Sequence, residues 1–414
     1  MNEKKLLVIG GGAAGFFCAV NAARIHKGLK VVLIEKSTKL LSKVKVSGGG
    51  RCNVTHDCNH ISELIQFYPR GASFLKKSFH QFNIRETVEW FQSRGIQLKT
   101  EADGRMFPES DTSQTIINCL LSEASQYGVE ILMNADVQSV TFTSDPLNKL
   151  NHFQVEFRNQ KKLEASFLCI ACGGFSKPSQ YHWIEQLGHT IESPVPSLFT
   201  FNIPHHKITS LMGITVQHAR VKISGTKLQQ EGPLLITHWG LSGPAVLKLS
   251  AWGARELANR LYDFDIVVNW IPDHNEQTLL EKFQRLRFEI ASQKIYNRNP
   301  FALPARLWEF LLSECEIKEE TRWADLAAKN QNKLIKLLCT HTLSVKGKTT
   351  FKEEFVTAGG IQLSEINPET MMSKLVPNLF FAGEILNIDG VTGGFNFQNA
   401  WTTGWIAANH LFDE

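Results

Sequence analysis

A glycine cluster directly after an apolar run constrains the fold of this chain more than any other feature. Residues 6–9 are Leu, Leu, Val and Ile, and Gly10, Gly12 and Gly15 follow with GxGxxG spacing. The first glycine permits a tight turn, the second lets the backbone approach a pyrophosphate, and the third lets a helix pack close to a strand. A second apolar run ends at Glu35, whose carboxylate can accept both hydroxyls of an adenosine ribose. The pattern predicts a strand, a turn and a helix that bind the ADP part of a dinucleotide.

The C-terminal region indicates which dinucleotide is bound. Residues 378–400 predict a short strand, then Gly383 and Glu384, then a glycine-rich turn that opens a helix at residues 393–396. A helix N-terminus presents amide N–H groups and a positive dipole end, which would stabilise negative charge on a reduced flavin ring. Glu384 would face the ribityl hydroxyls. A nicotinamide has no such requirement, so this pattern favours FAD.

The chain resembles the BaiN/YhiN-like flavoprotein family, also described as aminoacetone-oxidase-type FAD-binding proteins. The matching motifs run from end to end: SGGGRCNVT at 47–55, GRMFP at 104–108, THWGLSGPA at 237–245, TAGG at 357–360 and GGFNFQ at 393–398. The resemblance implies an α/β fold. Its Rossmann-like FAD/NAD(P)-binding domain would be of glutathione-reductase type, with an inserted β-barrel-like plus helical domain.

The glycine pattern and the resemblance together imply a set of cofactor-binding residues from both ends of the chain. We expect no metal site. The cofactor-binding candidates are Gly10, Gly12, Ala13, Ala14, Gly15, Glu35, Lys36, Lys43, Ser47, Gly48, Gly49, Arg51, Cys52, Asn53, Val137, Gly173, Gly383, Glu384, Gly393, Gly394, Phe395 and Asn396.

The sequence departs from the family pattern at two places. Leu41 and Ser42 replace the Gly-Arg pair that usually precedes the lysine matching Lys43. Cys172 stands where FAD proteins of this type usually have the threonine of Ala-Thr-Gly-Gly. The glycines that bring the backbone close to the cofactor remain, but contacts made by the arginine and the threonine are not expected here.

The eight cysteines are expected to be reduced thiols, because they lie singly or within apolar runs. Cys169 and Cys172 have CxxC spacing, but residues i and i+3 of a strand point to opposite faces, which argues against a redox pair. Cys52 lies beside Arg51, where a thiolate could be stabilised. A structural or cofactor-lining role for Cys52 is the favoured interpretation.

Three residues are candidates for contact with a substrate. Arg105 in the GRMFP turn can hold an anionic or carbonyl group, or can be an ordinary surface arginine. His238 lies in a loop of the insertion bounded by glycine and proline, and is either a pocket residue or a packed histidine. Asp389 precedes the flavin-facing turn. A basic stretch that includes Lys39 and Lys45 is either a platform for phosphates or a solvated loop.

Length and composition predict more than one domain. The 414 residues exceed what one core usually serves, and we expect an FAD-binding domain at 1–193 and 345–414. Between them, short strand patterns predict a β-rich subdomain at 194–275, and amphipathic spacing predicts a helical subdomain at 276–344. Three early glycines argue against a signal peptide and no apolar run is long enough to span a membrane, so we expect a cytoplasmic protein without membrane contact.

The residues predict an FAD-dependent oxidoreductase that transfers hydride at flavin N5. The resemblance implies a small amine or carbonyl compound as substrate. It also implies an alternative, reduction of uridine to dihydrouridine in ribosomal RNA, and a flavin-binding module without turnover is a third hypothesis. The net charge of +4 is small, so a small-molecule substrate is favoured over RNA and no stable nucleic-acid complex is expected. GxGxxG is not repeated, so NAD(P)H is expected at most as a transient electron donor.

Overall fold

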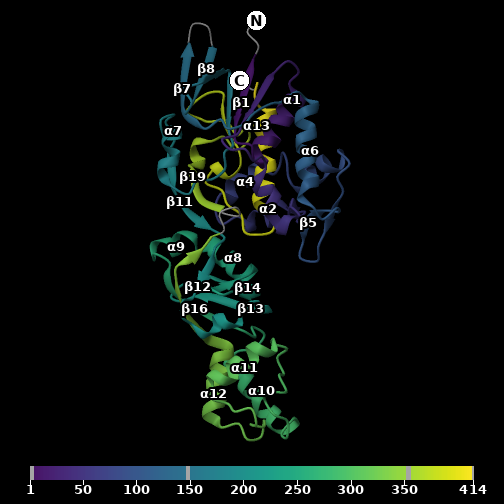
Figure 1. The fold of residues 1–414 in the computed structure, drawn as a ribbon, viewed down its shortest axis with the longest axis vertical. Coiled ribbons are helices and arrows are strands. Elements are labelled where there is room, and N and C mark those ends of the chain that lie inside the picture. Colours follow the sequence, from purple (N-terminus) through teal and green to yellow (C-terminus); the bar gives the residue numbers. More distant parts are fainter. Residues whose placement is uncertain (1–3, 146–149, 351–355, 413–414) are drawn as a thin grey trace. The chain divides into compact units, whose positions relative to one another are not determined.

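The computed structural model describes residues 4–145, 150–350 and 356–412 (Figure 1). It divides into two compact units, one formed by residues 1–197 and 352–414 and the other by residues 198–351. The boundaries at 193 and 345 that the sequence predicts lie near those of the two units. The further split of the insertion at residue 275 stays a prediction.

A five-stranded parallel sheet forms the centre of the first unit, with strand order β20-β10-β1-β2-β6. The inner strands are continuous apolar runs because both of their faces are buried. Leu7 at the centre pairs with Val32 on one side and Leu168 on the other. The strands are β1 (Lys5–Ile9), β2 (Lys30–Ile34), β6 (Glu130–Leu132), β10 (Phe167–Ile170) and β20 (Leu379–Phe381).

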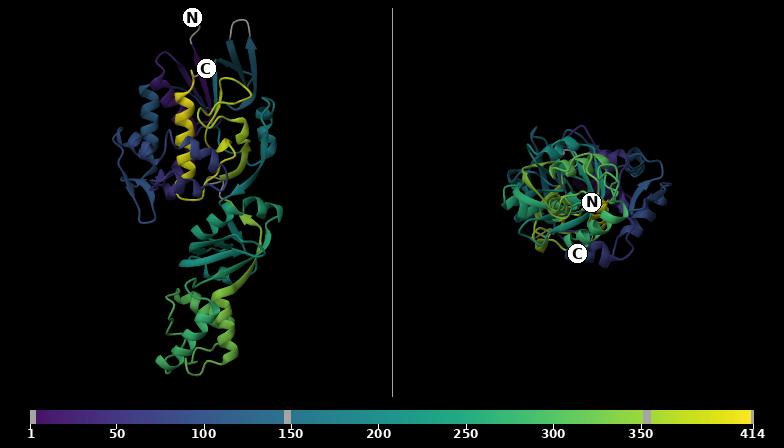
Figure 2. Two further views of the ribbon diagram at one scale, coloured as in Figure 1. Left: turned by 180° about the vertical axis from the view of Figure 1, so that it is seen from behind. Right: turned by 90° about the horizontal axis from the view of Figure 1, so that it is seen from below.

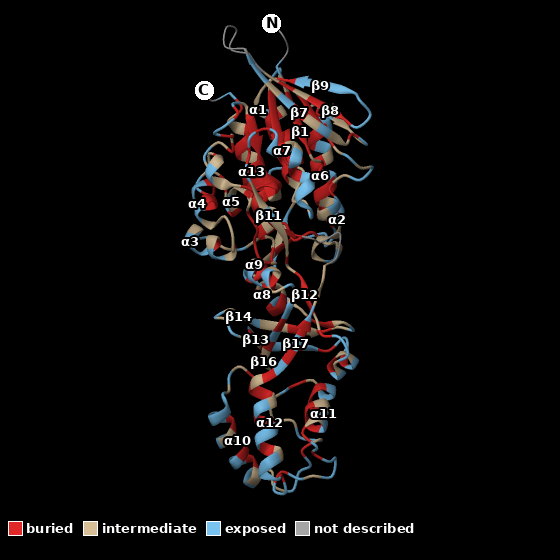
Figure 3. Ribbon diagram, turned by 90° about the vertical axis from the view of Figure 1, so that its left-hand side faces the viewer, coloured by how far each residue is buried: buried red, intermediate tan, exposed pale blue. Residues whose placement is uncertain are grey.

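Two helices from opposite ends of the sequence lie side by side in this unit (Figures 1 and 2). They are α1 (Ala13–Ile25) and α13 (Phe395–Asn409), and both are largely buried, as is β1 (Figure 3). A Cβ atom on Gly404 would lie 2.7 Å from the carbonyl oxygen of Ala14, so a glycine permits their close approach. The other helices of the unit are α2 (Ser42–Gly50), α3 (Ile61–Leu64), α4 (Ala72–Ser78), α5 (Ile84–Gln92), α6 (Ser113–Gln126) and α7 (His182–Glu185).

Among its described residues, the first unit also contains three small antiparallel sheets. One of them, β3-β5-β4, contains the GRMFP motif in β5. The three sheets are formed by β3 (Thr55–His56), β4 (Leu98–Thr100) and β5 (Arg105–Pro108); β7 (Val137–Asp145), β8 (Leu150–Phe157) and β9 (Lys162–Ala165); and β11 (Ile191–Ser197) and β19 (Val356–Ile361). The α/β class with a Rossmann-like parallel sheet is therefore confirmed.

The second unit begins with strands, which helices at 244–252 and 254–259 interrupt, and after further helices at 276–340 the chain returns to a strand at residue 341. Its antiparallel sheet has the order β17-β16-β13-β14-β15-β12-β18. Only Gly347 separates β17 from β18, and these two strands pair with β16 and β12, so the continuous segment 341–349 joins both edges into a barrel-like sheet. The strands are β12 (Thr200–Asn202), β13 (Thr215–Ile223), β14 (Gln229–Ile236), β15 (Gly240–Ser242), β16 (Asp263–Asn269), β17 (His341–Lys346) and β18 (Lys348–Thr349).

The helices of the second unit share one hydrophobic core with this sheet. Its helices are α8 (Pro244–Trp252), α9 (Ala254–Asn259), α10 (Glu276–Glu289), α11 (Ala305–Glu314) and α12 (Ala328–Thr340). In the described ranges of both units, no helix has the length and apolar character needed to cross a bilayer. Across the same residues, no group of His, Cys, Asp and Glu side chains is arranged to hold a metal ion.

Candidate cofactor site

The predicted cofactor residues follow the carboxyl ends of successive parallel strands. Gly10 follows β1, Glu35 follows β2, Gly173 lies in the segment after β10, and Gly383 lies in the segment after β20. The strand order places β1 and β10 side by side where the direction of winding reverses. Open α/β sheets bind ligands in the crevice at such a point. The structure therefore brings distant segments of the chain to the edge of the sheet where a dinucleotide is expected.

The three positions of the fingerprint are occupied by glycine for different structural reasons. Gly10 has φ +120°, and a Cβ atom there would lie 2.4 Å from the carbonyl oxygen of Ala171. A Cβ atom on Gly15 would lie 1.8 Å from the carbonyl oxygen of Gly10. Gly12 differs, because its φ of −93° suits any residue and no atom lies within 4 Å of its Cβ position. Gly10 and Gly15 are thus required by the packing of the chain, whereas Gly12 leaves open space at the N-terminus of α1, where Ala13 and Ala14 begin the helix.

Glu35 faces the same turn. Its Oε2 accepts a hydrogen bond from the Gly11 amide at 3.0 Å, and its Oε1 accepts one from the Ser37 amide at 2.8 Å. Each carboxylate oxygen has a second lone-pair direction, so these bonds leave capacity for the predicted ribose hydroxyls. The carboxylate lines a cavity of about 360 Å³ together with Gly10, Lys36, Val137, Cys172 and Trp183.

Glu384 is held by contacts from two other segments. The Lys43 ammonium lies 2.5 Å from its Oε2, and the Thr357 amide donates to its Oε1 at 2.9 Å. A Cβ atom on Gly174 would approach Glu384 Oε1 to 2.9 Å. Gly383 has φ +77° and packs against Ala14 of α1. Thr357 belongs to the TAGG motif but was not among the predicted site residues, and the paired glycines of that motif were the only signal for it.

The SGGGRCN segment begins where α2 loses its helical backbone conformation. Ser47 has ψ 148°, and Gly48 and Gly49 have φ 58° and 70°, so these three residues form a turn inside the bounds of α2. Cys52 is completely buried, and burial raises the pKa of its thiol to about 12. The thiol is therefore protonated near neutral pH, which favours the structural role over a stabilised thiolate.

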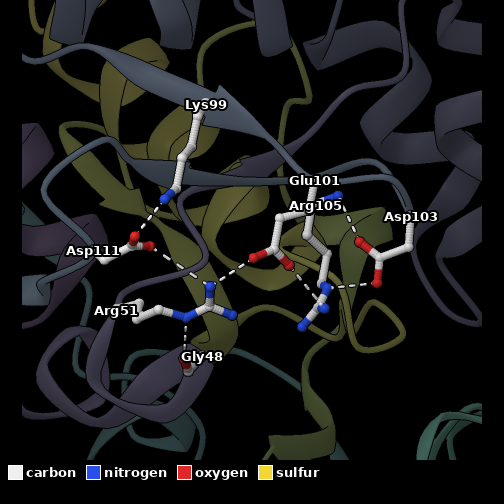
Figure 4. Close-up of polar contacts among 7 residues, drawn as sticks. All are labelled: Gly48, Arg51, Lys99, Glu101, Asp103, Arg105 and Asp111. Atoms are coloured by element: carbon white, nitrogen blue, oxygen red, sulfur yellow. Dashed lines mark hydrogen bonds and ion pairs between the residues drawn. The ribbon is translucent and has the colours of Figure 1, made fainter.

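Arg51 and Arg105 meet at one carboxylate (Figure 4). Nη1 of Arg51 lies 2.6 Å from Glu101 Oε1, and Nη2 of Arg105 lies 3.0 Å from Glu101 Oε2. Arg105 also binds Asp103 at 2.7 Å. Both guanidinium groups lie over the ring of Phe107, at 4.0 Å for Arg51 and 5.4 Å for Arg105. The substrate role predicted for Arg105 stays a hypothesis, and the sequence did not indicate Glu101.

The turn before α13 presents its backbone rather than its side chains. The ring of Phe395 is buried and stacks on that of Phe67, with 4.3 Å between the ring centroids. The side-chain amide of Asn396 accepts a hydrogen bond from the Gly390 N–H and donates one to the Gly390 carbonyl oxygen. Gly393 and Gly394 have φ 133° and 97°. In the orientation of the Asn53 side-chain amide that gives both of its ends a partner, the nitrogen donates to the Thr55 carbonyl oxygen at 2.9 Å. The oxygen accepts a hydrogen bond from the Gly394 backbone amide at 3.0 Å. The two predicted flavin-facing turns therefore contact each other.

Asp389 and His238 lie in different surroundings. Asp389 is completely buried and forms a bidentate ion pair with Arg70. The Ser197 hydroxyl donates a hydrogen bond to its carboxylate at 2.8 Å. Burial raises its pKa, while Arg70 and Ser197 lower it. His238 lies in the second unit, exposed between β14 and β15, with its ring edge-on to Trp239 at 3.9 Å. These contacts give Asp389 a structural function, and its catalytic role and that of His238 stay hypotheses.

Five of the other cysteines are buried and pack in the core, whereas Cys58 and Cys172 are half-buried. All eight are free thiols. Cys169 on β10 is buried and shares a hydrogen bond with Cys18 rather than with Cys172, and this contact and burial raise its pKa. Burial also raises the pKa of Cys172 to about 12. The CxxC spacing therefore does not bring its two sulfur atoms together as a reactive pair.

Comparison with known proteins agrees with this fold. Residues 4–410 match the family described as HI0933-like protein Rossmann domain. A ribosomal RNA dihydrouridine synthase of Escherichia coli is 30% identical over 99% of this chain and 98% of its own length. A 3-dehydro-bile acid delta(4,6)-reductase of Clostridium scindens is 26% identical over 97% of each chain.

Solved structures show the same fold at low sequence identity. A 3-ketosteroid delta1-dehydrogenase from Sterolibacterium denitrificans is 12% identical, with a TM-score of 0.52 and 99% coverage of both chains. A 3-ketosteroid-delta4-(5alpha)-dehydrogenase from Rhodococcus jostii RHA1 is also 12% identical, with a TM-score of 0.50, 98% coverage of this chain and 97% of its own. The family resemblance inferred from the motifs is confirmed.

Proposed function

The chain belongs to the HI0933-like Rossmann family and is a flavin-dependent oxidoreductase, and from this premise we propose that it uses FAD to reduce a small carbonyl compound. The observation that carries the cofactor proposal is the open space beside Gly12. Neither its backbone angles nor its packing require a glycine, because φ is −93° and no protein atom lies within 4 Å of the Cβ position. A ligand that approaches the backbone explains the residue, and the fingerprint assigns that ligand as a pyrophosphate.

The remaining residues fit the other parts of FAD. Glu35 and the cavity beside it suit the adenosine, because a carboxylate at the end of β2 can accept ribose hydroxyls. Lys43 and Glu384 suit the ribityl chain. The backbone of residues 47–50 and 393–394 would face the flavin ring. Bound FAD would supply hydride transfer at N5, with NAD(P)H as a transient donor.

The substrate class follows from the chemistry that two relatives have in common. One relative is named for reduction of a 3-dehydro-bile acid at positions 4 and 6, and the other for synthesis of dihydrouridine. In both cases the reduced carbon–carbon double bond is conjugated to a carbonyl group, which accepts negative charge as hydride adds. We therefore narrow the amine or carbonyl class to a compound in which a carbon–carbon double bond is conjugated to a carbonyl.

The charges near the site favour a small molecule over RNA. Lys43 is paired with Glu384, and Arg51 and Arg105 are paired with Glu101. A platform for a phosphate backbone needs cations that can replace counterions. Lys36, Lys39 and Lys45 are exposed and remain candidates for that role. The Escherichia coli relative keeps uridine reduction in ribosomal RNA as the second candidate function.

The test is anaerobic reduction of the FAD-loaded protein by NADPH, followed by separate additions of substrates. A steroid with a 4-ene-3-one group represents the conjugated carbonyl class, and a ribosomal RNA fragment represents the RNA class. An α-amino ketone would donate electrons, so it is added without oxygen to the oxidised FAD-loaded protein instead. We expect the steroid enone to reoxidise the flavin fastest. Faster reoxidation by the RNA fragment, or reduction of the oxidised flavin by the amino ketone, would contradict the proposal.

A binding measurement tests the RNA alternative separately. Filter binding of the RNA fragment at two salt concentrations is compared for wild type and for Lys39→Glu with Lys45→Glu. Lys43 is left unchanged because it contacts Glu384. Tight binding that weakens steeply with salt and is lost in the variant would support RNA as substrate. Weak binding that is indifferent to both lysines is the result we expect.

A further inference from the structure

We propose that Glu101 is a positioning residue that holds the turn at residues 47–53, here called the SGGGRCN turn, in the conformation needed for flavin binding. The inference rests on the proposed function, because it assigns this turn to the flavin. It adds a residue that lies outside the motifs of the cofactor site. The contact that carries it is the bond between Glu101 and Arg51.

The backbone of the SGGGRCN turn does not hold this conformation by itself. Gly48, Gly49 and Gly50 have φ of 58°, 70° and 88°, and Cys52 has φ 63°. Glycine adopts left-handed and right-handed backbone conformations with similar ease, so three successive glycines have many alternative backbone conformations. A cysteine enters this region only at a cost. Such backbones persist when contacts from the surrounding structure determine them.

Arg51 supplies those contacts from inside the turn. Its guanidinium stacks on Phe107 at 4.0 Å, and its Nε points to the carbonyl oxygen of Gly48 at 3.4 Å. Its Nη1 donates to Glu101 Oε1 at 2.6 Å. Asp111 lies farther from Arg51, at 3.6 Å, and also binds Lys99. Glu101 is thus the carboxylate nearest to Arg51, and it accepts the shortest hydrogen bond that Arg51 makes outside the turn (Figure 4).

The position of Glu101 is fixed by a tight hairpin between β4 and β5. The Glu101 amide donates to the carbonyl oxygen of Arg105 at 2.8 Å, and the Gly104 amide donates to the carbonyl oxygen of Glu101 at 2.9 Å. The second carboxylate oxygen accepts from Arg105 Nη2 at 3.0 Å. Because both oxygens are bonded, the carboxylate has little freedom to rotate, and it can orient Arg51.

The same hairpin supports the other flavin-facing turn. A Cβ atom on Gly104 would lie 2.5 Å from His56 Nε2, so the hairpin packs directly on that ring. His56 Nδ1 in turn lies 3.0 Å from the carbonyl oxygen of Gly393. The hairpin from Glu101 to Arg105 therefore contacts the SGGGRCN turn through Arg51 and the turn before α13 through His56. Glu101 is the residue of this hairpin that bonds Arg51.

The experiment compares Glu101→Gln with Asp103→Asn as a matched control. Asp103 lies in the same hairpin and bonds Arg105 at 2.7 Å, and among the described contacts it has none to Arg51. Three quantities are measured: amide hydrogen exchange of residues 47–53 in the FAD-free protein, the dissociation constant for FAD, and the reduction potential of the bound flavin. The exchange measurement reports on the turn without any cofactor.

For Glu101→Gln we expect exchange in the turn and the FAD dissociation constant each to rise about tenfold, the effect of weakening one charge-assisted bond. The potential should become more negative, because disordered amides stabilise the reduced flavin less. Asp103→Asn should stay within about twofold of wild type, because the Asp103 side chain is 57% exposed and has no described contact to Arg51. In a double-mutant cycle, adding Glu101→Gln to Arg51→Gln should cause no further loss.

Two results would overturn the inference. If Glu101→Gln matches Asp103→Asn in exchange, affinity and potential, Glu101 does not position the turn. If both changes are additive in the cycle, Glu101 does not act through Arg51. Wild-type protein that binds no flavin would overturn the proposed function itself, and the inference with it, which distinguishes that failure from the other two. Circular dichroism of each variant verifies that it folds.

Discussion

The Lys43 ammonium lies 2.5 Å from Oε2 of Glu384, although 341 positions separate these residues in the chain. The pair joins α2 to the segment that follows β20. The side chain of Glu384 is only 14% exposed, whereas that of Lys43 is 42% exposed. A carboxylate with so little access to water depends on its partners, and Lys43 and the Thr357 amide provide them.

The two acids of the cofactor site should both affect FAD binding. We expect Glu35→Ala to weaken FAD through the ribose and Glu384→Ala through the ribityl chain, each by about 1.5–3 kcal/mol for a charge-assisted hydrogen bond. Flavin fluorescence titration measures the affinity. Lys39→Met, a change at an exposed lysine, is the control. Unchanged affinity in both acid variants would show that the cofactor lies elsewhere.

Substitutions at two fingerprint glycines should separate binding from folding. Gly12→Val places a side chain in open space, so the protein should fold with normal stability. It should lose the flavin absorbance at about 450 nm, which is the usual band of oxidised flavins. Gly15→Ala places Cβ 1.8 Å from the Gly10 carbonyl oxygen, which should cost about 1–3 kcal/mol of stability. Denaturant unfolding and absorbance are measured for both. Normal flavin content in Gly12→Val would contradict the pyrophosphate assignment.

Asp389→Asn should lower stability more than turnover. The change removes the buried carboxylate charge that Arg70 binds, for which we expect a loss of about 3–5 kcal/mol. Urea unfolding of the variant is compared with Glu89→Gln, which breaks an exposed pair with Arg85 and should cost less than about 1 kcal/mol. A stable Asp389→Asn protein without turnover would instead support the catalytic hypothesis.

The second unit should lose stability as the pH falls. Burial lowers the pKa of His341 from 6.5 to about 4, and its Nδ1 accepts a hydrogen bond from Trp270 Nε1 at 3.1 Å, so the folded state requires the neutral ring. The unfolded chain binds this proton first, near pH 6.5, and stability therefore decreases from about pH 6.5 down to about pH 4. The difference corresponds to about 3 kcal/mol.

The control for this pH dependence is His341→Gln. Its stability should vary less between pH 6.5 and pH 4, because the substituted side chain does not titrate. Urea unfolding at several pH values, followed by tryptophan fluorescence, measures the effect. A wild-type profile that is flat over this range would contradict the assignment to His341.

The sequence predicted the Rossmann-like sheet because such a sheet depends on local patterns, whereas the assignment of residues at its carboxyl edge to the cofactor stays a prediction. Alternation and apolar runs record which faces are buried, and GxGxxG records the close packing at Gly10 and Gly15. The side-chain roles were harder to predict. Glu35 was expected at the ribose and is found bonded to the Gly11 and Ser37 amides, and the side chains of Phe395 and Asn396 turn into the protein.

The sequence by itself determined the backbone framework of this protein: the strand, turn and helix at the N-terminal end, the returning strand and helix at the C-terminal end, and the insertion between them. Only the tertiary structure decided which charges meet. Arg51 and Glu101 are 50 positions apart, Arg70 and Asp389 are 319 apart, and Lys43 and Glu384 are 341 apart. Helices and strands give neighbouring residues a periodic pattern of apolar and polar side chains, which can be read from the sequence. An ion pair depends instead on which distant segments the folded core brings together.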